Sequence, residues 1–318
     1  KTFEFAEKKF FLSACKRAIE DAGLSTGEVD LLLGGDLLNQ IITASYSARD
    51  LGIPFLGVYG ACSGMAESLA AASMLLDGGF GRNILCAASS HFATAERQFR
   101  MPLEHGNQRP PSAQWTATAA GAMVLSCGSE KEASLIADEE GNTQQAKEVQ
   151  VTFGTIGKVI DAGIKDANQM GAAMAPAAVD TILTHLEETG RTLDHYDLVC
   201  TGDLGFIGKS IVRDLLEDAG VSRKMIADVY DDCGAMIYAP EQDIHSGGSG
   251  CGCSASVFAG YVYRNMKEGK IGRALIVSTG AMLSTISPFQ GESIPGIAHA
   301  ISLESVSGIM DREKGCRK

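Results

Sequence analysis

The stretch AIEDAGLSTGEVDLLLGGDLLN at residues 18–39 recurs without gaps as HLEETGRTLDHYDLVCTGDLGF at residues 185–206. Seven of the 22 aligned positions are identical, and the aspartates Asp36 and Asp203 are one of these pairs. In both copies a helical pattern ends at a glycine and is followed by a short apolar run, which is typical of a buried strand. The chain therefore contains an α/β unit that occurs twice.

A second alignment supports the duplication. Residues 61–88, beginning ACSGMAESL, align with residues 252–279, beginning GCSASVFAG. This alignment pairs Cys62 with Cys253 and places each at the start of a helix that leads into a strand. Two matches in the same order are stronger evidence for a repeat than either match alone.

The repeat predicts two α/β halves, residues 1–150 and 151–318, related by a pseudo-twofold axis. Near-continuous apolar strands between helices indicate sheets that are covered on both faces. Ligands of open α/β sheets bind where the carboxyl ends of strands meet helix N-termini. We therefore expect one pocket at the junction of the halves, near Cys62, Asp203 and Cys253.

Composition excludes several classes of function. The 318 residues carry a net charge of −12 and few aromatic side chains, with no basic stripe, so no nucleic-acid partner is expected. No apolar run reaches the roughly 18 residues that span a bilayer. The nine cysteines are an odd number spread along the chain rather than a disulfide framework, which predicts an intracellular protein.

Three motifs resemble the thiolase and ketoacyl-synthase superfamily. They are a cysteine at a helix start in GACSG (60–64), a strand ending AGAMVLS (120–126) and a glycine turn in STGAMLS (278–284). The resemblance extends over nearly the whole chain. It implies a thiolase-like fold, in which the two duplicated α/β halves form a layered αβαβα architecture.

A more specific resemblance is to the stage V sporulation protein AD family. It rests on GDLLNQ (35–40), SSHFATAERQFR (89–100), AMAPAA (173–178), GGSGCGCSA (247–255) and GESIPGIAH (291–299). The resemblance implies a protein that binds dipicolinic acid or its calcium chelate during uptake into the developing bacterial spore. It also implies a peripheral location at the spore inner membrane, with other membrane proteins of the same uptake system as partners.

The same resemblance sets expectations for cofactors and assembly. No cofactor is expected, and any calcium should arrive with the dipicolinate. Because the superfamily pairs subunits through a sheet edge, a homodimer is compatible with the resemblance. Cys251 and Cys253 lack the second ligand pair and the spacing of a zinc site, so no metal site is expected.

Condensing enzymes of this superfamily use a cysteine nucleophile assisted by a histidine and an asparagine. Cys62 matches the nucleophile, but Asp203 lies nearest the position of the histidine, and the asparagine loop offers Cys251 and Cys253. A carboxylate beside Cys62 raises the pKa of the thiol and repels a developing oxyanion. We therefore expect a binding protein rather than an enzyme.

The predicted ligand-binding residues are Cys62, His91, Arg97, Asp203 and Cys253. Arg97 was chosen because a guanidinium group binds a carboxylate through two hydrogen bonds. Structural alternatives exist for three of them. Cys62 could be a small residue required for packing, His91 a locally hydrogen-bonded loop residue, and Arg97 part of an ion pair on a solvated helix face.

Two other functions remain open at this point. The first is an acyltransferase or ketoacyl-synthase-type enzyme that uses Cys62 as its nucleophile with an unidentified base. The second is a scaffold for membrane partner proteins with a vestigial pocket. Saturable binding of a ligand without an adduct on Cys62 distinguishes the binding protein from both.

Overall fold

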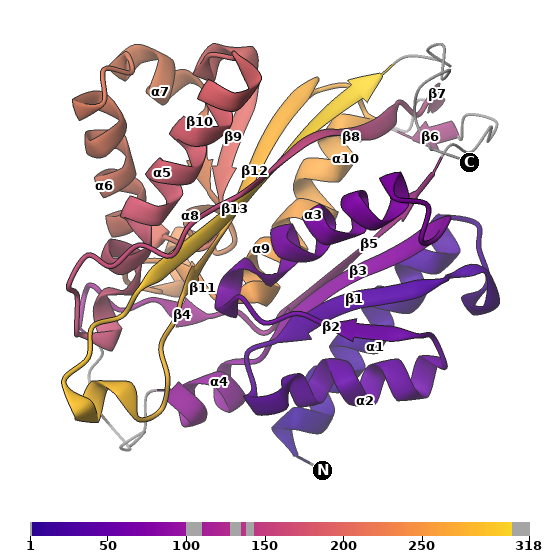
Figure 1. Cartoon of the computed structure of the whole chain (residues 1–318), viewed down its shortest axis with the longest axis horizontal. Coiled ribbons are helices and arrows are strands. Elements are labelled where there is room, and N and C mark those ends of the chain that lie inside the picture. Colours follow the sequence, from indigo (N-terminus) through magenta and orange to yellow (C-terminus); the bar gives the residue numbers. More distant parts are fainter. Residues whose placement is uncertain (1, 100–109, 128–134, 138–142, 307–318) are drawn as a thin grey trace.

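The computed structural model describes residues 2–99, 110–127, 135–137 and 143–306, and within them it forms two mixed sheets (Figure 1). The first sheet has the strand order β2-β1-β3-β5 and the second has the order β10-β9-β12-β13-β8. Their strands are β1 (Leu31–Asp36), β2 (Phe55–Gly57), β3 (Asn83–Ser90), β5 (Ala119–Ser126), β8 (Glu148–Ile156), β9 (Leu198–Thr201), β10 (Tyr230–Asp232), β12 (Arg273–Ala281) and β13 (Gly296–Val306).

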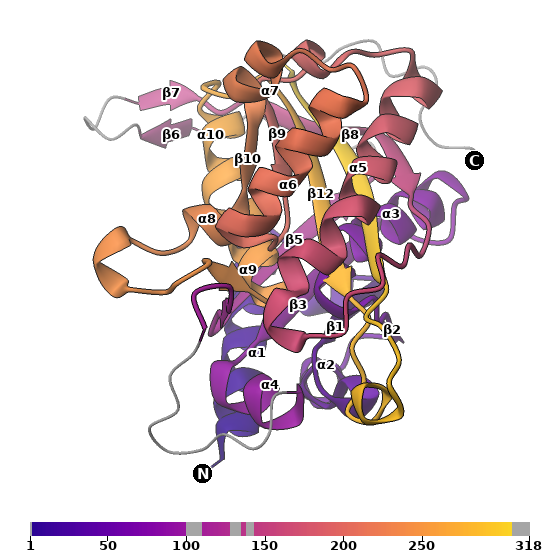
Figure 2. The same ribbon diagram turned by 90° about the vertical axis from the view of Figure 1, so that its left-hand side faces the viewer.

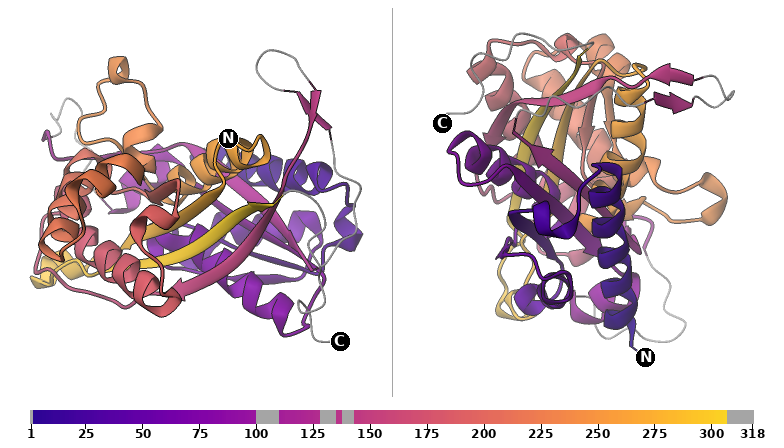
Figure 3. Two further views of the ribbon diagram at one scale, coloured as in Figure 1. Left: turned by 90° about the horizontal axis from the view of Figure 1, so that it is seen from above. Right: turned by 90° about the vertical axis from the view of Figure 1, so that its right-hand side faces the viewer.

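Two small two-stranded sheets complete the strands. Their members are β4 (Trp115–Thr116) with β11 (Gly248–Ser249), and β6 (Leu135–Ala137) with β7 (Thr143–Gln145). The β4–β11 pair joins segments from the two halves. The paired strands β6 and β7 project away from both large sheets, as Figures 2 and 3 show.

Helices surround and separate the large sheets. The α-helices are α1 (Phe3–Asp21), α2 (Ile42–Leu51), α3 (Gly64–Asp77), α4 (Phe92–Phe99), α5 (Met170–Thr189), α6 (Gly205–Asp218), α7 (Arg223–Val229), α8 (Cys233–Met236), α9 (Cys251–Ser256) and α10 (Tyr263–Lys267). Short 3₁₀ helices are η1 (Thr26–Glu28), η2 (Asn39–Ile41), η3 (Ala61–Ser63), η4 (Ala167–Gln169), η5 (Leu193–His195), η6 (Pro240–Gln242) and η8 (Ser287–Gln290). A π-helical segment, η7 (Val257–Val262), connects α9 to α10.

The elements stack in five layers. Helices α1 and α2 cover the outer face of the first sheet, and α5 and α6 cover that of the second (Figures 1 and 2). Helix α3 contacts strands of both sheets, so it lies in the central layer with the α9–α10 segment. The thiolase-like αβαβα architecture is therefore confirmed.

Burial explains why the strands read as continuous apolar runs. In β3 and β12 every residue after the first is buried, because helices cover both faces of each sheet. The largest core cluster lies between the sheets and draws residues from both halves. Two further clusters lie under the outer helices of each sheet.

The duplication is visible in the strand directions. In each sheet one strand pairs in parallel with two neighbours, β1 with β2 and β3, and β9 with β10 and β12. The last of these strands then pairs antiparallel with β5 or β13. The second sheet has one further strand, β8, at the outer edge of β13.

The first sequence alignment is correct to the residue. The aligned aspartates Asp30 and Asp197 each lie just before the first aligned strand. One oxygen of each carboxylate accepts two backbone hydrogen bonds of 2.7 to 3.0 Å from the turn before the next strand. The donors are the backbone amides of Arg82 and Asn83 in the first half, and of Gly272 and Arg273 in the second. An identical residue thus makes the same contact in both halves.

The second alignment is displaced along its whole length, by two residues at the cysteine and by one residue from the end of the helix onward. It pairs Cys62 with Cys253, whereas the structure makes Cys251 the equivalent of Cys62. Each of these two cysteines directly follows a residue in the left-handed region, Ala61 with φ of 51° and Gly250 with φ of 102°. The cysteine equivalent to Cys62 therefore lies two residues before Cys253.

The π-helical segment η7 accounts for one residue of this displacement. Both helical segments end at equivalent glycines, Gly79 and Gly269, each with φ of 76°. The path from Cys251 to Gly269 is one residue longer than that from Cys62 to Gly79. A π-turn accommodates the additional residue inside the helix, and a gap-free alignment cannot represent it.

Candidate functional site

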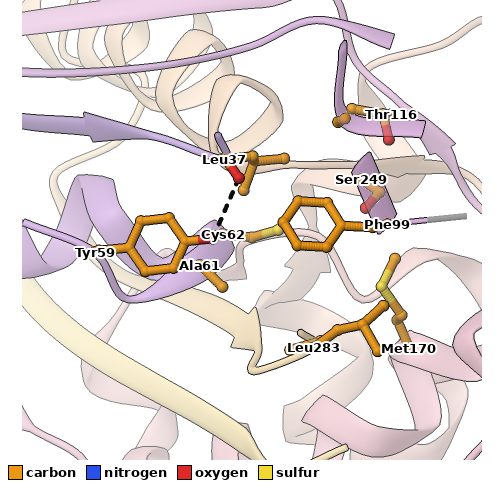
Figure 4. A pocket seen from close by; sticks show the side chains of 11 residues that line it. Leu37, Tyr59, Ala61, Cys62, Phe99, Thr116, Met170, Ser249 and Leu283 are labelled. Carbon is orange, nitrogen blue, oxygen red and sulfur yellow. Dashed lines mark hydrogen bonds between the residues drawn. The ribbon is translucent and has the colours of Figure 1, made fainter. Parts of the chain in front are cut away.

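A cavity lies at the junction of the two halves, beside the N-terminus of α3. Its volume is about 40 Å³, and residues of both halves line it: Leu37, Tyr59, Ala61, Cys62, Ala95, Phe99, Thr116, Met170, Ser249, Ala281 and Leu283. None of these side chains carries a formal charge, and most are apolar. Figure 4 shows Cys62 among the rings of Tyr59 and Phe99. This cavity is called the Cys62 pocket below.

The loop before α3 fixes the position of Cys62. Ala61 adopts a left-handed φ of 51°, and the hydroxyl of Ser63 donates a 2.6 Å hydrogen bond to the carbonyl of Gly60. Strand β12 approaches this loop so closely that a Cβ on Gly280 would lie 2.3 Å from the Gly60 oxygen. The glycine of the STGAMLS motif is therefore required for the two halves to meet at Cys62.

Asp203 lies beneath Cys62 and is completely buried. Its carboxylate accepts hydrogen bonds from the amide of Gly250 at 2.7 Å, the hydroxyl of Thr279 at 2.8 Å and the hydroxyl of Ser249 at 3.5 Å. The thiol of Cys62 lies close enough for the charge of Asp203 to raise its pKa. Burial raises the pKa of Asp203, and these donors oppose that rise.

The thiol of Cys62 is held in its protonated form. Burial raises the pKa of Cys62 well above its ordinary value, and the negative charge of Asp203 raises it further. Because the thiolate is the nucleophilic form of cysteine, this environment suppresses attack on a thioester at neutral pH. The sequence predicted that Asp203 raises the pKa of Cys62, and the buried position of Asp203 has this effect.

The residues around the pocket do not form a metal site in the described structure. In the part of the chain that the structure describes, no group of three or more His, Cys, Asp or Glu side chains is arranged to hold a metal ion. Seven described cysteines are free and buried, and Cys62 is the member that lines the pocket. The carboxylate oxygens of Asp203 at the pocket floor are used in hydrogen bonds within the second half.

Comparison with known proteins assigns the family. A profile of stage V sporulation protein AD (SpoVAD) matches residues 1–304. The chain belongs to the stage V sporulation protein AD family. It is 46% identical over 308 residues to stage V sporulation protein AD of Bacillus subtilis (strain 168), a match that covers 97% of this chain and 85% of that protein. This SpoVAD-family chain is thus similar to a sporulation protein of an endospore-forming bacterium.

Solved structures show the same fold at low identity. The 3-oxoacyl-[acyl-carrier-protein] synthase III of Aquifex aeolicus VF5 is 17% identical with a TM-score of 0.55, and the match covers 96% of this chain and 85% of the enzyme. A variant of OleA from Xanthomonas campestris is 12% identical with a TM-score of 0.60, covering 94% and 82%. These relations place the SpoVAD-family chain in a fold that it shares with condensing enzymes. No helix among its described residues is long and apolar enough to cross a membrane.

The structure brings three of the five predicted site residues together. Cys62 lines the pocket, Asp203 lies beneath it, and Cys253 lies behind Asp203. The Cys253 side chain is completely buried, and its sulfur is 3.9 Å from the carbonyl oxygen of Gly202. Cys253 therefore contributes to the support of Asp203 and does not line the cavity.

The other two predicted residues lie elsewhere. Arg97 lines a different cavity and forms an ion pair with Glu4 of α1. His91 accepts a 3.1 Å hydrogen bond from the amide of Ala93, and its ring centroid is 5.4 Å from that of Phe3. Neither side chain is among those that line the Cys62 pocket.

Sequence reasoning missed the apolar walls of the pocket. Tyr59, Phe99, Met170 and Leu283 line it, although none was selected. Tyr59 directly precedes the GACSG motif, so its proximity to Cys62 in the sequence was a usable signal. Phe99 and Met170 are far from the motif in sequence, and only the packing of α4 and α5 brings them to the site.

Proposed function

We propose that this protein binds dipicolinic acid or its calcium chelate in the Cys62 pocket, without catalysing condensation, during dipicolinate uptake at the membrane of the developing spore. The position of the buried Asp203 beside Cys62 carries the proposal. It keeps the sulfur protonated, so the pocket offers a polarizable thiol and aromatic surfaces in place of a nucleophile.

The shape and chemistry of the lining support a flat aromatic ligand. Two aromatic side chains, Tyr59 and Phe99, contribute to its walls, and offset stacking on such rings stabilises a planar heterocycle. The hydroxyls of Thr116 and Ser249 donate to the carboxylates of Glu96 at 3.0 Å and Asp203 at 3.5 Å, so each can donate to a ligand carboxylate only after it rotates away from that partner. A chelate in which calcium neutralises both carboxylates avoids placing an uncompensated anion near Asp203.

The small volume of the Cys62 pocket means that it must widen before dipicolinate can enter. A cavity of about 40 Å³ holds only a few water molecules. A substituted pyridine therefore enters only if wall side chains change rotamer. Phe99 and Met170 are the large side chains at the end of α4 and the start of α5, so their movement opens the pocket most directly.

Calorimetric titration with dipicolinate, with and without calcium, tests the proposal. We expect saturable binding that falls at least about tenfold in Leu283→Trp, which fills the pocket, a loss of about 1.4 kcal/mol. Met282→Trp is the matched control, because Met282 is the exposed neighbour of Leu283 and does not line the pocket. Absence of binding in both calcium conditions, or equal binding by the two tryptophan variants, contradicts the proposal.

A further inference from the structure

A second cavity lies on the opposite side of α4 from the Cys62 pocket. Its volume is about 390 Å³, which is within the usual range for small-molecule sites. Helix α4 separates the cavities: Ala95 and Phe99 face the Cys62 pocket, while Thr94, Arg97 and Gln98 line the second cavity. Segments of α1 and of the η2 region provide the remaining lining, which consists of Glu4, Leu38, Asn39, Gln40 and Ile42.

The two charges of this cavity balance each other. Among the residues that the structure describes, Arg97 and Glu4 are the ionised members of the lining, and they form an ion pair. Their side chains are 52% and 35% exposed, so both remain accessible to a solute. A ligand that separates them must carry both signs of charge, because a simple anion or cation leaves one partner unpaired or repelled.

Amide groups provide the polar surface between the charges. Two hydrogen bonds fix the side chain of Gln98. Its Oε1 accepts from the backbone N–H of Asn39 at 3.2 Å, and its Nε2 donates to the backbone carbonyl of Leu37 at 3.1 Å. The Nδ2 of Asn39 and the side-chain amide of Gln40 have no hydrogen-bond partner among the residues that the structure describes. These amides are available to a ligand in the cavity.

The backbone under Gln40 is strained. Gln40 and Ile41 are consecutive non-glycine residues in the left-handed region, with φ of 57° and 44°. Such a conformation costs about 1–3 kcal/mol per residue and is concentrated at functional sites. The surrounding structure maintains it, because Ile41 packs against Gly57 and the Asp36 carboxylate accepts hydrogen bonds from the loop.

We propose that this cavity binds a small zwitterion of the α-amino acid type. The ligand's carboxylate pairs with the Arg97 guanidinium, which can make two parallel hydrogen bonds to it. Its ammonium group pairs with the Glu4 carboxylate, so the original ion pair is replaced by two. The amides of Asn39 and Gln40 contact the ligand's polar side chain.

The test uses L-serine and L-glutamine with analogues that lack one charge. Binding to the full chain is measured by calorimetry and by saturation-transfer NMR, with N-acetyl-L-serine and L-serinamide as the analogues. We expect saturable binding of at least one amino acid and binding of each analogue that is weaker by about tenfold or more. Arg97→Gln and Glu4→Gln should each weaken amino-acid binding to a similar extent.

Arg49→Gln provides the matched control. Arg49 also pairs with a carboxylate, that of Asp50, but it lies on α2 and does not line the cavity. It should leave amino-acid binding unchanged. The proposal is overturned if neither amino acid binds at about 10 mM, if both single-charge analogues bind as well as their parent, or if Arg97→Gln and Glu4→Gln have no effect. Competition by dipicolinate for the same site also overturns it, because that result defines an anion site.

Discussion

The carboxylate of Asp203 is completely buried beside Cys62, at the floor of the pocket between the two halves, and its charge raises the pKa of the Cys62 thiol. A nucleophilic cysteine requires a neighbouring group that withdraws its proton. Here the neighbouring group is Asp203, and its charge keeps the proton on the sulfur of Cys62. This relationship determines what the pocket can do, and it can be tested by the reactivity of Cys62.

Removing the charge of Asp203 should make Cys62 more reactive. Burial and Asp203 both raise the pKa of Cys62, so alkylation by iodoacetamide should be slow at pH 8 and still rising at pH 10. Asp203→Asn removes the second cause, and each unit by which the pKa falls increases the thiolate fraction about tenfold. Peptide mass spectrometry after timed alkylation measures the rate at each pH.

Cys253 is the internal control for that experiment. Cys253 is buried behind Asp203. Its alkylation is measured in the same peptide digest as that of Cys62. If Asp203→Asn accelerated both cysteines equally, the site would have opened and the electrostatic explanation would be incorrect. Selective acceleration at Cys62 is the expected result.

The close approach of β12 to the Cys62 loop predicts a pronounced effect of a single methyl group. Gly280→Ala should destabilise the protein by about 3 kcal/mol, because the added Cβ would meet the backbone oxygen of Gly60 at 2.3 Å. Gly64→Ala is the matched change, since nothing lies within 4 Å of its Cβ and its φ of −52° is helical. That variant should be neutral or more stable by up to about 1 kcal/mol. Urea unfolding of both variants measures the difference, and equal stabilities would disprove the contact.

A buried carboxyl under α1 predicts pH-dependent stability. Burial, and next the nearby Asp36, raise the pKa of Glu7 from 4.5 to about 7. The folded protein therefore binds this proton more tightly than the unfolded chain. The resulting stability is fully present below pH 4.5 and is lost as the pH rises to about 7, a change of about 3 kcal/mol at most.

Glu7→Gln should remove that dependence. The variant should unfold at a higher temperature than the wild type at pH 8 and show a smaller difference at pH 5. The hydroxyls of Ser89 and Thr94, which donate to the Glu7 carboxylate, can be retained as partners of the amide. Glu20→Gln, at the exposed end of the same helix, is the control. Thermal unfolding of the three proteins at both pH values decides the prediction, and a parallel shift at both values refutes it.

The fold could be predicted because the repeat preserves residues with a backbone role. Asp30 and Asp197 align in the sequence and bind equivalent turns in the structure. The helix alignment was less accurate because η7 includes an additional residue. A π-turn leaves the apolar pattern of a helix almost intact, so the sequence contains no clear sign of it.

The site was only partly predictable for a different reason. Helix α4 was known to carry Arg97, but which of its faces meets Cys62 depends on how the helix packs. Ala95 and Phe99, which are four residues apart, share the face toward the Cys62 pocket, and Arg97 lies on the other. A search for charged groups selected the wrong face because the pocket wall is apolar.

One measurement tests the central account of the Cys62 pocket most directly. The intact protein is incubated with acetyl-CoA or with dipicolinate, and the modification of Cys62 is followed by mass spectrometry, including alkylation at pH 10. The account predicts no acyl adduct from acetyl-CoA and saturable protection of Cys62 from alkylation by dipicolinate. An acyl adduct that disappears in Cys62→Ala, together with no protection by dipicolinate, would contradict it.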